Sequence, residues 1–316
     1  MVWLPLPEAY SPVGGPALAG PACLINETSE TSVDAQNGDR SACPLLSLKW
    51  AKLLPWHEFS GDSMNHEKTS LFIQAAEAMG NSTCAIAMTG AGISVPSGIP
   101  DFRSPGGLWS RFDPQTVCSD WALRNNPEGV WDFLFDALNM FSRAEPNPAH
   151  LSLAELEEMG IIKAVITQNI DNLHQVAGSR DVIEFHGGCG SFFCNECRTD
   201  YELSAALALT REDIPWLCSD CRGIIRPSVV FFGEQIPLIA MTRSQDLADQ
   251  ADLVLIIGTS GEVAPANILP RIIKGRGGKV IEINLGSTAY DGFSDIKLDM
   301  PAEIALPNIL DHLKTK

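Results

Sequence analysis

The sequence predicts an α/β fold in which a doubly wound parallel sheet carries a small inserted domain. Short runs of almost wholly apolar residues alternate with segments of helical periodicity, a pattern typical of parallel strands buried on both faces. One segment interrupts this rhythm and holds four cysteines in the pattern Cys-x2-Cys-x20-Cys-x2-Cys. The interruption indicates that a second, smaller unit is inserted between strands of the sheet.

The elements of the sheet can be located from their periodicity. Apolar residues at helical spacing predict a helix over Lys68–Met79 that stops at Gly80, and another over Leu151–Met159. This alternation of helices with buried strands is Rossmann-like. The expected strands are Cys84–Met88, Lys163–Thr167, Leu253–Ile257 and Val280–Ile283.

Two segments leave this rhythm and are expected to form the small domain. The first, 112–140, is interpreted as helical, with aromatic residues that belong to the core. The second, 188–226, contains the four cysteines and predicts a zinc ribbon. The large domain would then consist of 64–111, 141–187 and 227–316. The aromatic residues assigned to the core are Trp121, Trp131, Phe133 and Phe135.

Residues 1–63 carry no sustained periodicity and are rich in Pro, Gly and Ser. They predict a disordered extension, or a start assigned too far upstream, since Met64 directly precedes the first helix. The extension contains no basic start followed by an apolar run, and no stretch of the chain has the length of a transmembrane helix. A cytoplasmic protein that contacts no membrane is therefore expected.

Composition narrows the expected partners. The 316 residues include 39 acidic and 22 basic ones, for a net charge of −17. A nucleic-acid binder needs a basic surface, so this charge argues against nucleic acid, whereas basic, lysine-bearing partners are compatible with it. Five cysteines lie outside the quartet, and an odd number without obvious pairing fits a reducing compartment.

The cysteine quartet predicts one structural Zn²⁺ site. Cys194 with Cys197 and Cys218 with Cys221 form two pairs, each in a tight turn, and four thiolates complete a tetrahedral shell. No position is left for a catalytic water, so the chemistry must lie elsewhere. Four unrelated buried cysteines are the alternative, but two such pairs at this spacing rarely arise by chance.

The chemistry is expected beyond the carboxyl ends of the strands, where doubly wound sheets have their active clefts. The loop Thr89–Ser94 follows the first strand and carries two glycines. Its backbone could approach a pyrophosphate, whose charge N–H groups and a helix N-terminus would balance. The full Gly-x-Gly-x-x-Gly motif is absent, so from this loop alone a simple tight turn is an equally good interpretation.

The joint set of motifs resembles that of the sirtuins, NAD-dependent protein-lysine deacylases, and most of all the zinc-containing bacterial and archaeal type. The matches occur in family order over about residues 65–305, and residues 1–63 have no counterpart in the family core. The matching segments are GAGIS (90–94), SGIPDFRS (97–104), TQNIDNLH (167–174), His186-Gly187, the cysteine quartet, VVFFGE (229–234), GTS (258–260) and IEIN (281–284).

The resemblance implies an NAD site along the strand ends. Asp101 and Phe102 would lie on a mobile cofactor loop, where Phe102 shields the reactive sugar from water. Ile170 and Asp171 would hold the nicotinamide carboxamide, and Asn169 would position the nicotinamide ribose and a water. The full implied set is Gly90, Ala91, Gly92, Ser94, Asp101, Phe102, Arg103, Gln168, Asn169, Ile170, Asp171, Gly258, Thr259, Ser260, Asn284, Leu285, Pro301 and Ala302, the last two near the adenine.

The resemblance also implies that His186 and Asn169 are the catalytic residues. An imidazole accepts a proton near neutral pH, and His186 directly precedes the zinc module, so we interpret it as the general base. A lone histidine after a strand is more often structural, which is our interpretation of His174.

The substrate is expected to lie between two segments. The VVFFGE segment and the segment around Val263 would hold a peptide as an added strand, through backbone hydrogen bonds that demand little of its sequence. Val230 and Phe232 would line the tunnel for the acyl-lysine. The implied substrate residues are Val230, Phe232, Gly233, Glu234 and Val263.

Three positions bear on substrate choice. Sirtuins that remove acidic acyl groups carry a Tyr-x-x-Arg pair in the helical segment, where this chain aligns Leu134 and Ala137. A succinyl carboxylate would have no partner there, so uncharged acyl groups such as acetyl are expected. Glu262 stands where the family often has an apolar residue, and it bears on peptide preference near the rim.

The predicted function is NAD-dependent deacetylation of acetyl-lysine proteins. The acyl group would pass from N6-acyl-lysine to ADP-ribose, releasing nicotinamide, free lysine and 2′-O-acyl-ADP-ribose. Two alternatives stay open: a mono-ADP-ribosyltransferase, and a non-catalytic sensor of NAD or ADP-ribose. The complete set of Asn169, Asp171 and His186 favours deacylation over both.

Overall fold

The computed structural model describes residues 62–101 and 107–315. Phe102 and Arg103, two of the predicted NAD-binding residues, lie outside the described residues, as does nearly all of the predicted extension. The first helix, α1 (Asp62–Gly80), begins at Asp62 rather than at Lys68, so it starts within the predicted extension. It belongs to a compact unit that begins at Gly61.

Six parallel strands form the large sheet, in the order β3-β2-β1-β7-β8-β9. Numbered in chain order among themselves, these strands run 3-2-1-4-5-6, which is the doubly wound, Rossmann-like order. The predicted fold class is confirmed, and the order reverses between β1 and β7. The strands are β1 (Ala85–Thr89), β2 (Ile162–Thr167), β3 (Val182–Glu184), β7 (Leu253–Ile257), β8 (Lys279–Asn284) and β9 (Ile296–Asp299).

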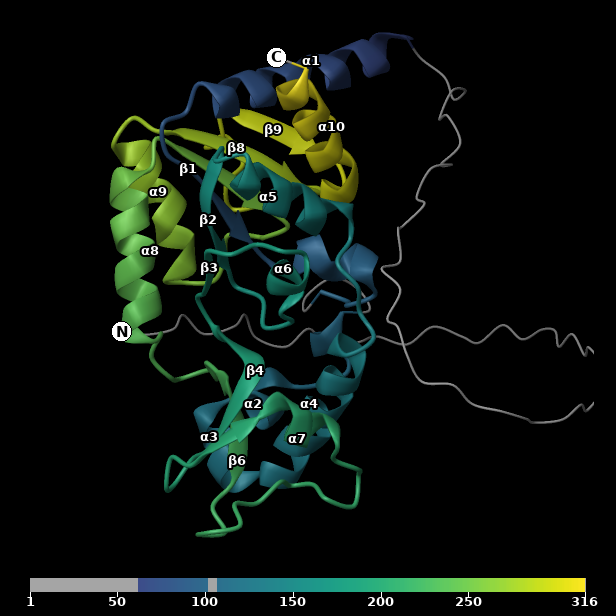
Figure 1. Cartoon of the computed structure of the whole chain (residues 1–316), viewed down its shortest axis with the longest axis vertical. Coiled ribbons are helices and arrows are strands. Elements are labelled where there is room, and N and C mark those ends of the chain that lie inside the picture. Colours follow the sequence, from purple (N-terminus) through teal and green to yellow (C-terminus); the bar gives the residue numbers. More distant parts are fainter. Residues whose placement is uncertain (1–61, 102–106, 316) are drawn as a thin grey trace, which may run out of the picture. The chain divides into compact units, whose positions relative to one another are not determined.

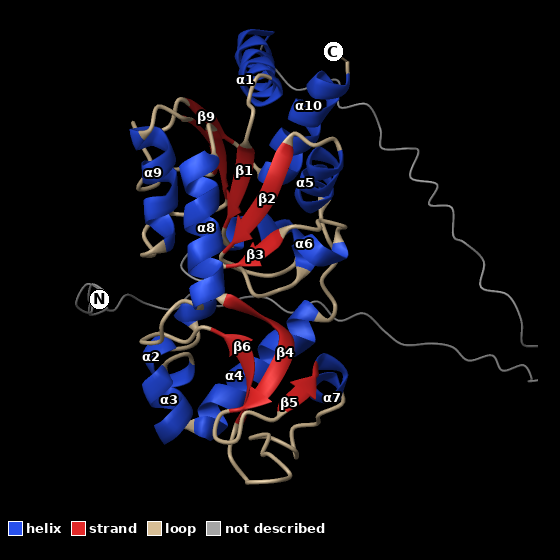
Figure 2. Cartoon of the chain, turned by 60° about the vertical axis from the view of Figure 1, so that its left-hand side comes forward, coloured by secondary structure: helices blue, strands red, loops and turns tan. Residues whose placement is uncertain are grey.

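Helices cover both faces of this sheet, because side chains alternate along each strand. Ala85 and Ala87 of β1 pack in one core cluster with residues of α1, α5 and α10, whereas Ile86 and Met88 pack in another with residues of α8 and α9. Figures 1 and 2 show these two helix layers on opposite sides of the sheet. The bounds are α5 (Pro148–Glu158), α8 (Leu238–Gln250), α9 (Leu269–Gly275) and α10 (Ala302–Lys314).

The carboxyl ends of the central strands lie level with one another. Thr89, the last residue of β1, is in register with both Thr167 of β2 and Ile257 of β7. Ile257 is in turn in register with Ile283 of β8. The loops that follow these strands therefore start from one edge of the sheet, as the motifs required.

Two glycine loops meet at the point where the strand order reverses. The Gly92 N–H donates to the Gly258 carbonyl at 2.9 Å, and Gly90 N–H donates to Ile257 at 3.0 Å. A Cβ on Gly90 would come within 2.7 Å of the Gly258 oxygen, and one on Gly258, whose φ is +60°, within 2.3 Å of the Ile93 nitrogen. Only glycine fits this contact.

The small part is an antiparallel sheet, β5-β4-β6, packed with helices. Strand β4 (Gly187–Cys194) follows the large sheet directly after His186, and β6 (Ile225–Val229) returns to it. The Trp131 indole N–H donates to the Ile225 carbonyl at 2.9 Å and so ties α4 to β6. The remaining elements are β5 (Asp200–Glu202), α2 (Pro114–Val117), α3 (Asp120–Asn125), α4 (Pro127–Phe141), α6 (Leu173–Val176), α7 (Leu203–Leu207) and the 3₁₀ turns Ala91–Ser97, Leu108–Ser110 and Ala266–Ile268.

The prediction that the aromatic residues of the helical segment belong to the core is right for Trp131 and Phe133, which are members of the core cluster of the small part, and wrong for Trp121. Trp131 and Phe133 are buried, and Phe135 is half-buried. Trp121, by contrast, is 61% exposed, because Ala122 and Leu123 take the buried positions of its short helix. Among the described residues, no helix combines the length and the apolar character needed to cross a bilayer.

We expect Gly258→Ala to destabilise the protein by about 3–5 kcal/mol, because the new Cβ meets backbone atoms and the residue is left-handed. The control is Gly292→Ala, which also has a positive φ, +72°, but open space around the Cβ. It should cost only about 1–2 kcal/mol. Urea unfolding measures both; equal losses would mean that the close contact carries no weight.

Candidate active site and metal centre

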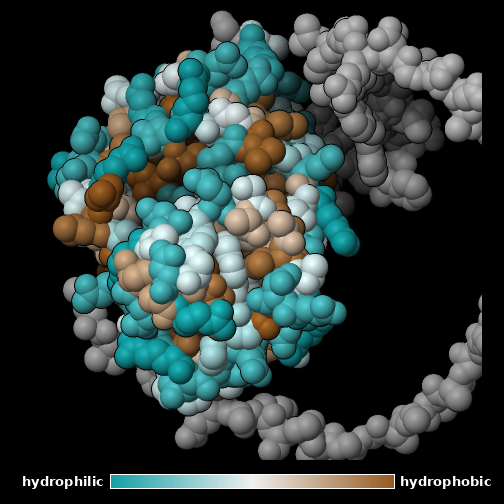
Figure 3. Space-filling model, turned by 60° about the horizontal axis from the view of Figure 1, so that its bottom comes forward, coloured by the Kyte–Doolittle hydropathy of each residue, from teal (hydrophilic) through white to brown (hydrophobic). Residues whose placement is uncertain are grey.

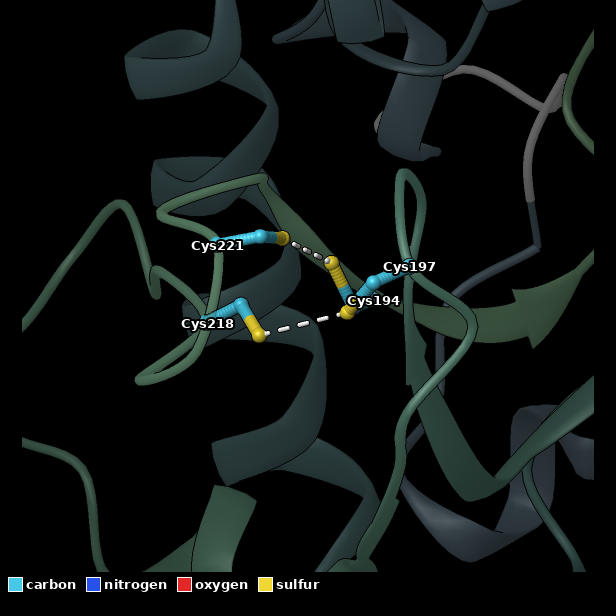
Figure 4. A group of neighbouring side chains, drawn as sticks. All are labelled: Cys194, Cys197, Cys218 and Cys221. Carbon is cyan, nitrogen blue, oxygen red and sulfur yellow. Dashed lines mark hydrogen bonds between the residues drawn. The ribbon is translucent and has the colours of Figure 1, made fainter.

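Four sulfur atoms converge at the end of the small sheet. Cys194, Cys197, Cys218 and Cys221 place their Sγ atoms within 4.8 Å of one another. The Sγ atoms of Cys194 and Cys221 are 3.4 Å apart, and those of Cys197 and Cys218 are 3.6 Å apart (Figure 4). Sulfurs bound tetrahedrally to Zn²⁺ at 2.3 Å would lie roughly 3.8 Å apart, so this arrangement fits one zinc ion.

Two turns of the same geometry supply these thiols. The Arg198 N–H donates to the Cys194 carbonyl, and the Arg222 N–H donates to the Cys218 carbonyl, both at 3.0 Å. Both arginines have a left-handed backbone, with φ of 65° and 66°. The duplicated turn explains why the two Cys-x-x-Cys pairs face each other. Four thiolates leave no open coordination position, so such a zinc would be structural.

His186 follows strand β3 and faces the start of the β2 loop. Its Nδ1 lies 3.1 Å from the Gln168 carbonyl oxygen, which can only accept, so Nδ1 carries the proton. The Nε2 atom is buried and has no hydrogen-bond partner among the described residues. Burial lowers the pKa of His186 below 6.5, opposed by the bond to Gln168. The ring is thus neutral at pH 7, with an available lone pair on Nε2.

Asn169, Asp171 and Ser94 form a buried polar cluster beside the glycine loop. The Asn169 amide donates to the Gly90 carbonyl and to Ser94 Oγ, both at 3.1 Å. Ser94 Oγ donates to Asp171 at 2.7 Å, and the Leu173 N–H donates to the other Asp171 oxygen at 3.0 Å. Burial raises the pKa of Asp171 above 3.8, while these hydrogen bonds oppose the rise. The loops after β1 and β2 are therefore joined by hydrogen bonds between side chains that are predicted to contact NAD.

The same linkage continues across the sheet to β7 and β8. The Gln168 amide donates to Thr259 Oγ1 at 3.0 Å, and the Asn284 amide donates to the Thr259 carbonyl at 2.7 Å. Leu285, next to Asn284, is 65% exposed. Ser260, exposed, follows Thr259.

The remaining predicted NAD-binding residues lie at the edges of this row of loops. Pro301 and Ala302 form the start of α10, and the neighbouring Met300 N–H donates to the Asn284 carbonyl at 3.1 Å. Asp101 is the last described residue before the gap, and its carbonyl accepts from the Leu108 N–H at 2.9 Å. The structure thus brings the loops after β1, β2, β7 and β8 together.

A second layer of polar side chains under these loops was not predicted. Thr89 Oγ1 lies 2.9 Å from both Thr167 Oγ1 and His174 Nε2, and the rings of His174 and His150 are 4.9 Å apart. Burial lowers the pKa of His150 to about 4 and that of His174 to about 3, so both are neutral at pH 7. The hydrogen bond between His174 Nε2 and Thr89 agrees with the interpretation of His174 as structural, although its Nδ1 has no partner among the described residues. Two strands that both end in threonine were the available sequence signal.

The predicted peptide segment departs from β6 with its burial alternating. Phe231 is buried, whereas its neighbours Val230 and Phe232 are half-buried. The Val230 N–H donates to the His186 carbonyl at 2.8 Å, and the Phe232 N–H to the Cys118 carbonyl at 2.9 Å. This segment therefore runs between the general-base candidate and the helical part.

Glu234 uses its carboxylate within the chain. One oxygen accepts from the Phe231 N–H at 2.9 Å and from the Arg226 guanidinium at 2.8 Å, and the other oxygen also pairs with Arg226. Arg226 is 4% exposed and lies over the Phe231 ring. Glu234 thus stabilises the turn that follows Phe231. The other two predicted substrate residues are more accessible: Gly233 is exposed and Val263 is half-buried.

Fold and site together define a doubly wound α/β protein with an inserted cysteine module. The Sir2 family model matches residues 90–265. A protein named NAD-dependent protein deacetylase from Caldivirga maquilingensis is 47% identical over 242 residues, which are 76% of this chain and 93% of that protein. Its namesake from Saccharolobus solfataricus is 44% identical over 247 residues, 78% of this chain and 98% of that one.

Solved structures agree with the sequence relatives. A chain solved in work on the mechanism and regulation of Sir2 enzymes has a TM-score of 0.73 and 40% identity, covering 78% of this chain and 98% of that one. A Sir2 homologue solved with NAD has a TM-score of 0.72 and 37% identity, covering 77% and 93%. This chain belongs to the Sir2 family, and the resemblance to sirtuins is confirmed.

We expect the purified protein to contain one zinc ion per chain, and Cys221→Ser to lower that content and loosen the small sheet. Elemental analysis and urea unfolding with and without a chelator measure the two effects. Cys84→Ser is the control, since Cys84 lies outside the quartet. Full zinc content in Cys221→Ser would contradict a four-thiolate site.

Proposed function

We propose that this chain is an NAD-dependent protein-lysine deacetylase. The observation that carries the proposal is the state of His186. Its Nδ1–H is held by the Gln168 carbonyl, and its Nε2 lone pair is buried and unused beside the predicted NAD loops. A neutral imidazole in this state is suited to general-base catalysis.

The loops fit a dinucleotide at the point where the strand order reverses. Gly90 and Gly92 keep the first loop close to Gly258, and Asn169 with Asp171 presents polar groups beside it. When bound, NAD supplies nicotinamide as the leaving group and ADP-ribose as the acyl acceptor. We assign the remaining predicted cofactor residues to the same site, including those outside the described residues.

The proposed role of His186 is to move one proton. Its Nε2 would accept a proton from a ribose hydroxyl of the bound dinucleotide, and the freed oxygen would take the acyl group. Asn169 would orient the ribose, because its amide is already fixed by Gly90 and Ser94. Asp171, held by Ser94 and Leu173, would orient the carboxamide.

The proposed substrate is an acetyl-lysine peptide held between the segment 230–234 and Val263. Val230 and Phe232 are half-buried and flank the buried Phe231 in the chain, which is compatible with lining a tunnel. A Sir2 structure solved with a p53 peptide and NAD is 36% identical to this chain over 77% of it, with a TM-score of 0.70. It supports a peptide as the substrate class. We also propose that 112–140 and 188–226 act as one small domain beside this segment.

We expect His186→Ala to lower kcat/KM for an acetyl-lysine peptide at least about a hundredfold, with NAD affinity nearly unchanged. Mass spectrometry of peptide, nicotinamide and O-acetyl-ADP-ribose measures turnover, and calorimetry measures NAD binding. His312→Ala on α10 is the control. Full activity of His186→Ala would refute the assignment.

In the unsubstituted protein, activity should fall only below pH 6.5, because burial lowers the pKa of His186 and its protonation removes the base.

Acyl preference follows from two buried positions. Leu134 and Ala137 are 2% and 5% exposed, and Leu134 belongs to the apolar cluster of the small part. A carboxylate placed among such residues would lose its hydration without gaining a partner. We therefore propose that uncharged acyl groups are preferred.

We expect kcat/KM for a butyryl-lysine peptide to exceed that for the succinyl-lysine peptide by more than about tenfold, since burying an unpaired polar group costs about 1–3 kcal/mol or more. Butyryl is the matched control, because it has the length of succinyl without its charge. Comparable rates for the two peptides would show that a cation reaches the acyl pocket.

A further inference from the structure

A hollow of about 560 Å³ opens beside the proposed peptide segment. Val230, Gly233 and Gln235 line one part of it, and Asn195 and Arg198 from the first zinc turn line another. The inference drawn from this hollow rests on the proposed function, because the function places an acyl-lysine peptide along Val230–Gly233. Any peptide bound there would have neighbouring side chains within reach of the hollow.

Two of the three arginines that line the hollow already have partners. Arg226 is buried and pairs with Glu234 through both of its terminal nitrogens. Arg124 contacts both Asp120 oxygens at 2.6 Å. These two pairs cancel their own charges and leave no cation for a ligand.

Arg198 is the exception. Its guanidinium carbon lies 5.0 Å from the centre of the Phe193 ring, a cation–π contact, and its side chain forms no hydrogen bond with another described residue. Among the described residues, no carboxylate forms an ion pair with it. The Arg198 N–H donates to the Cys194 carbonyl, and the Arg198 backbone is left-handed. These two features fix the position of the backbone from which the side chain extends.

The charge of the hollow is opposite to that of the whole chain. Three arginines against Asp120 and Glu234 give its lining a net charge of +1, whereas the chain carries −17. The end of the molecule that carries β4 and β6 comes forward in Figure 3, and its surface is largely hydrophilic with scattered apolar patches. The hollow is therefore better suited to selecting a ligand by its negative charge, through one cation, than by apolar contact.

We propose that this hollow is a substrate subsite for an anionic side chain, and that Arg198 is the residue that pairs with it. The ligand is a carboxylate or phosphate on the substrate protein, a few residues from the acyl-lysine. A planar guanidinium stacked on an aromatic ring presents two parallel donors, which match either group. Asn195, half-buried in the same lining, offers a neutral donor beside it.

The test is a panel of acetyl-lysine peptides in which each of four positions on either side carries alanine, glutamate, phosphoserine or lysine in turn. At one or two adjacent positions, glutamate should lower KM about two- to fivefold relative to alanine, the range for a partly exposed ion pair. Lysine should raise KM there. The glutamate advantage should shrink as salt rises from 0.05 to 0.5 M. A larger gain from phosphoserine than from glutamate would identify phosphate as the preferred source.

Arg222 provides a matched control for Arg198. It holds the equivalent place in the second zinc turn, with the same bond to a cysteine carbonyl and the same φ, and it does not line the hollow. We expect Arg198→Gln to abolish the glutamate advantage while leaving KM for the all-alanine peptide and the zinc content unchanged. Arg222→Gln should retain the advantage. Arg198→Glu should reverse the preference, so that lysine lowers KM at that position.

The outcomes separate this inference from the proposed function. If the neutral peptide is deacetylated but no acidic position lowers KM, or if Arg222→Gln loses the preference as Arg198→Gln does, the subsite is overturned and the function stands. If no peptide is turned over, the proposed function fails. Fluorescence anisotropy with labelled glutamate and alanine peptides then decides the subsite by itself, because equal affinities would overturn it.

Discussion

The contact between the loops after β1 and β7 is the constraint on which the site depends. Gly90 and Gly92 approach Gly258 so closely that a single methyl group on any of them would meet backbone atoms. Because the strand ends are level, this contact brings together loops that are far apart in the chain. The site therefore requires both the register of the sheet and the absence of side chains at these glycines.

Neutral polar groups buried under the loops hold the reactive groups in place. Thr89 and Thr167 join two strand ends, and His174 hydrogen-bonds to Thr89. Burial keeps His174 and its neighbour His150 uncharged, so this layer adds no fixed charge near Asp171. Such a layer orients side chains through hydrogen bonds without placing a fixed charge beneath the loops.

The cysteine module is connected through the backbone to His186, the candidate general base. Strand β4 starts directly after His186, and the His186 carbonyl accepts from the Val230 N–H at 2.8 Å. His186 is thus fixed by β4, to which it is covalently joined, and by the segment that follows β6, which donates a hydrogen bond to it. A zinc ion that performs no chemistry would still act on the site, because it fixes the far ends of β4 and β6 near Cys194 and Ile225. The same module places Arg198 at the hollow beside the proposed peptide segment.

The sequence by itself determined the fold class, the cysteine quartet and the family, because each depends on local spacing: apolar runs, paired Cys-x-x-Cys turns and short motifs at strand ends. It also gave bounds for four of the six strands of the large sheet, but not for β3, which it only implied before His186, or for β9; both are short and contain charged residues. It left the Thr89 loop ambiguous between a tight turn and a phosphate site. Only the tertiary structure decided that Trp121 is exposed, that Glu234 forms an ion pair with Arg226, and that Arg198 has no acidic partner among the described residues. These outcomes depend on which distant segments meet, and no local pattern of residues records that.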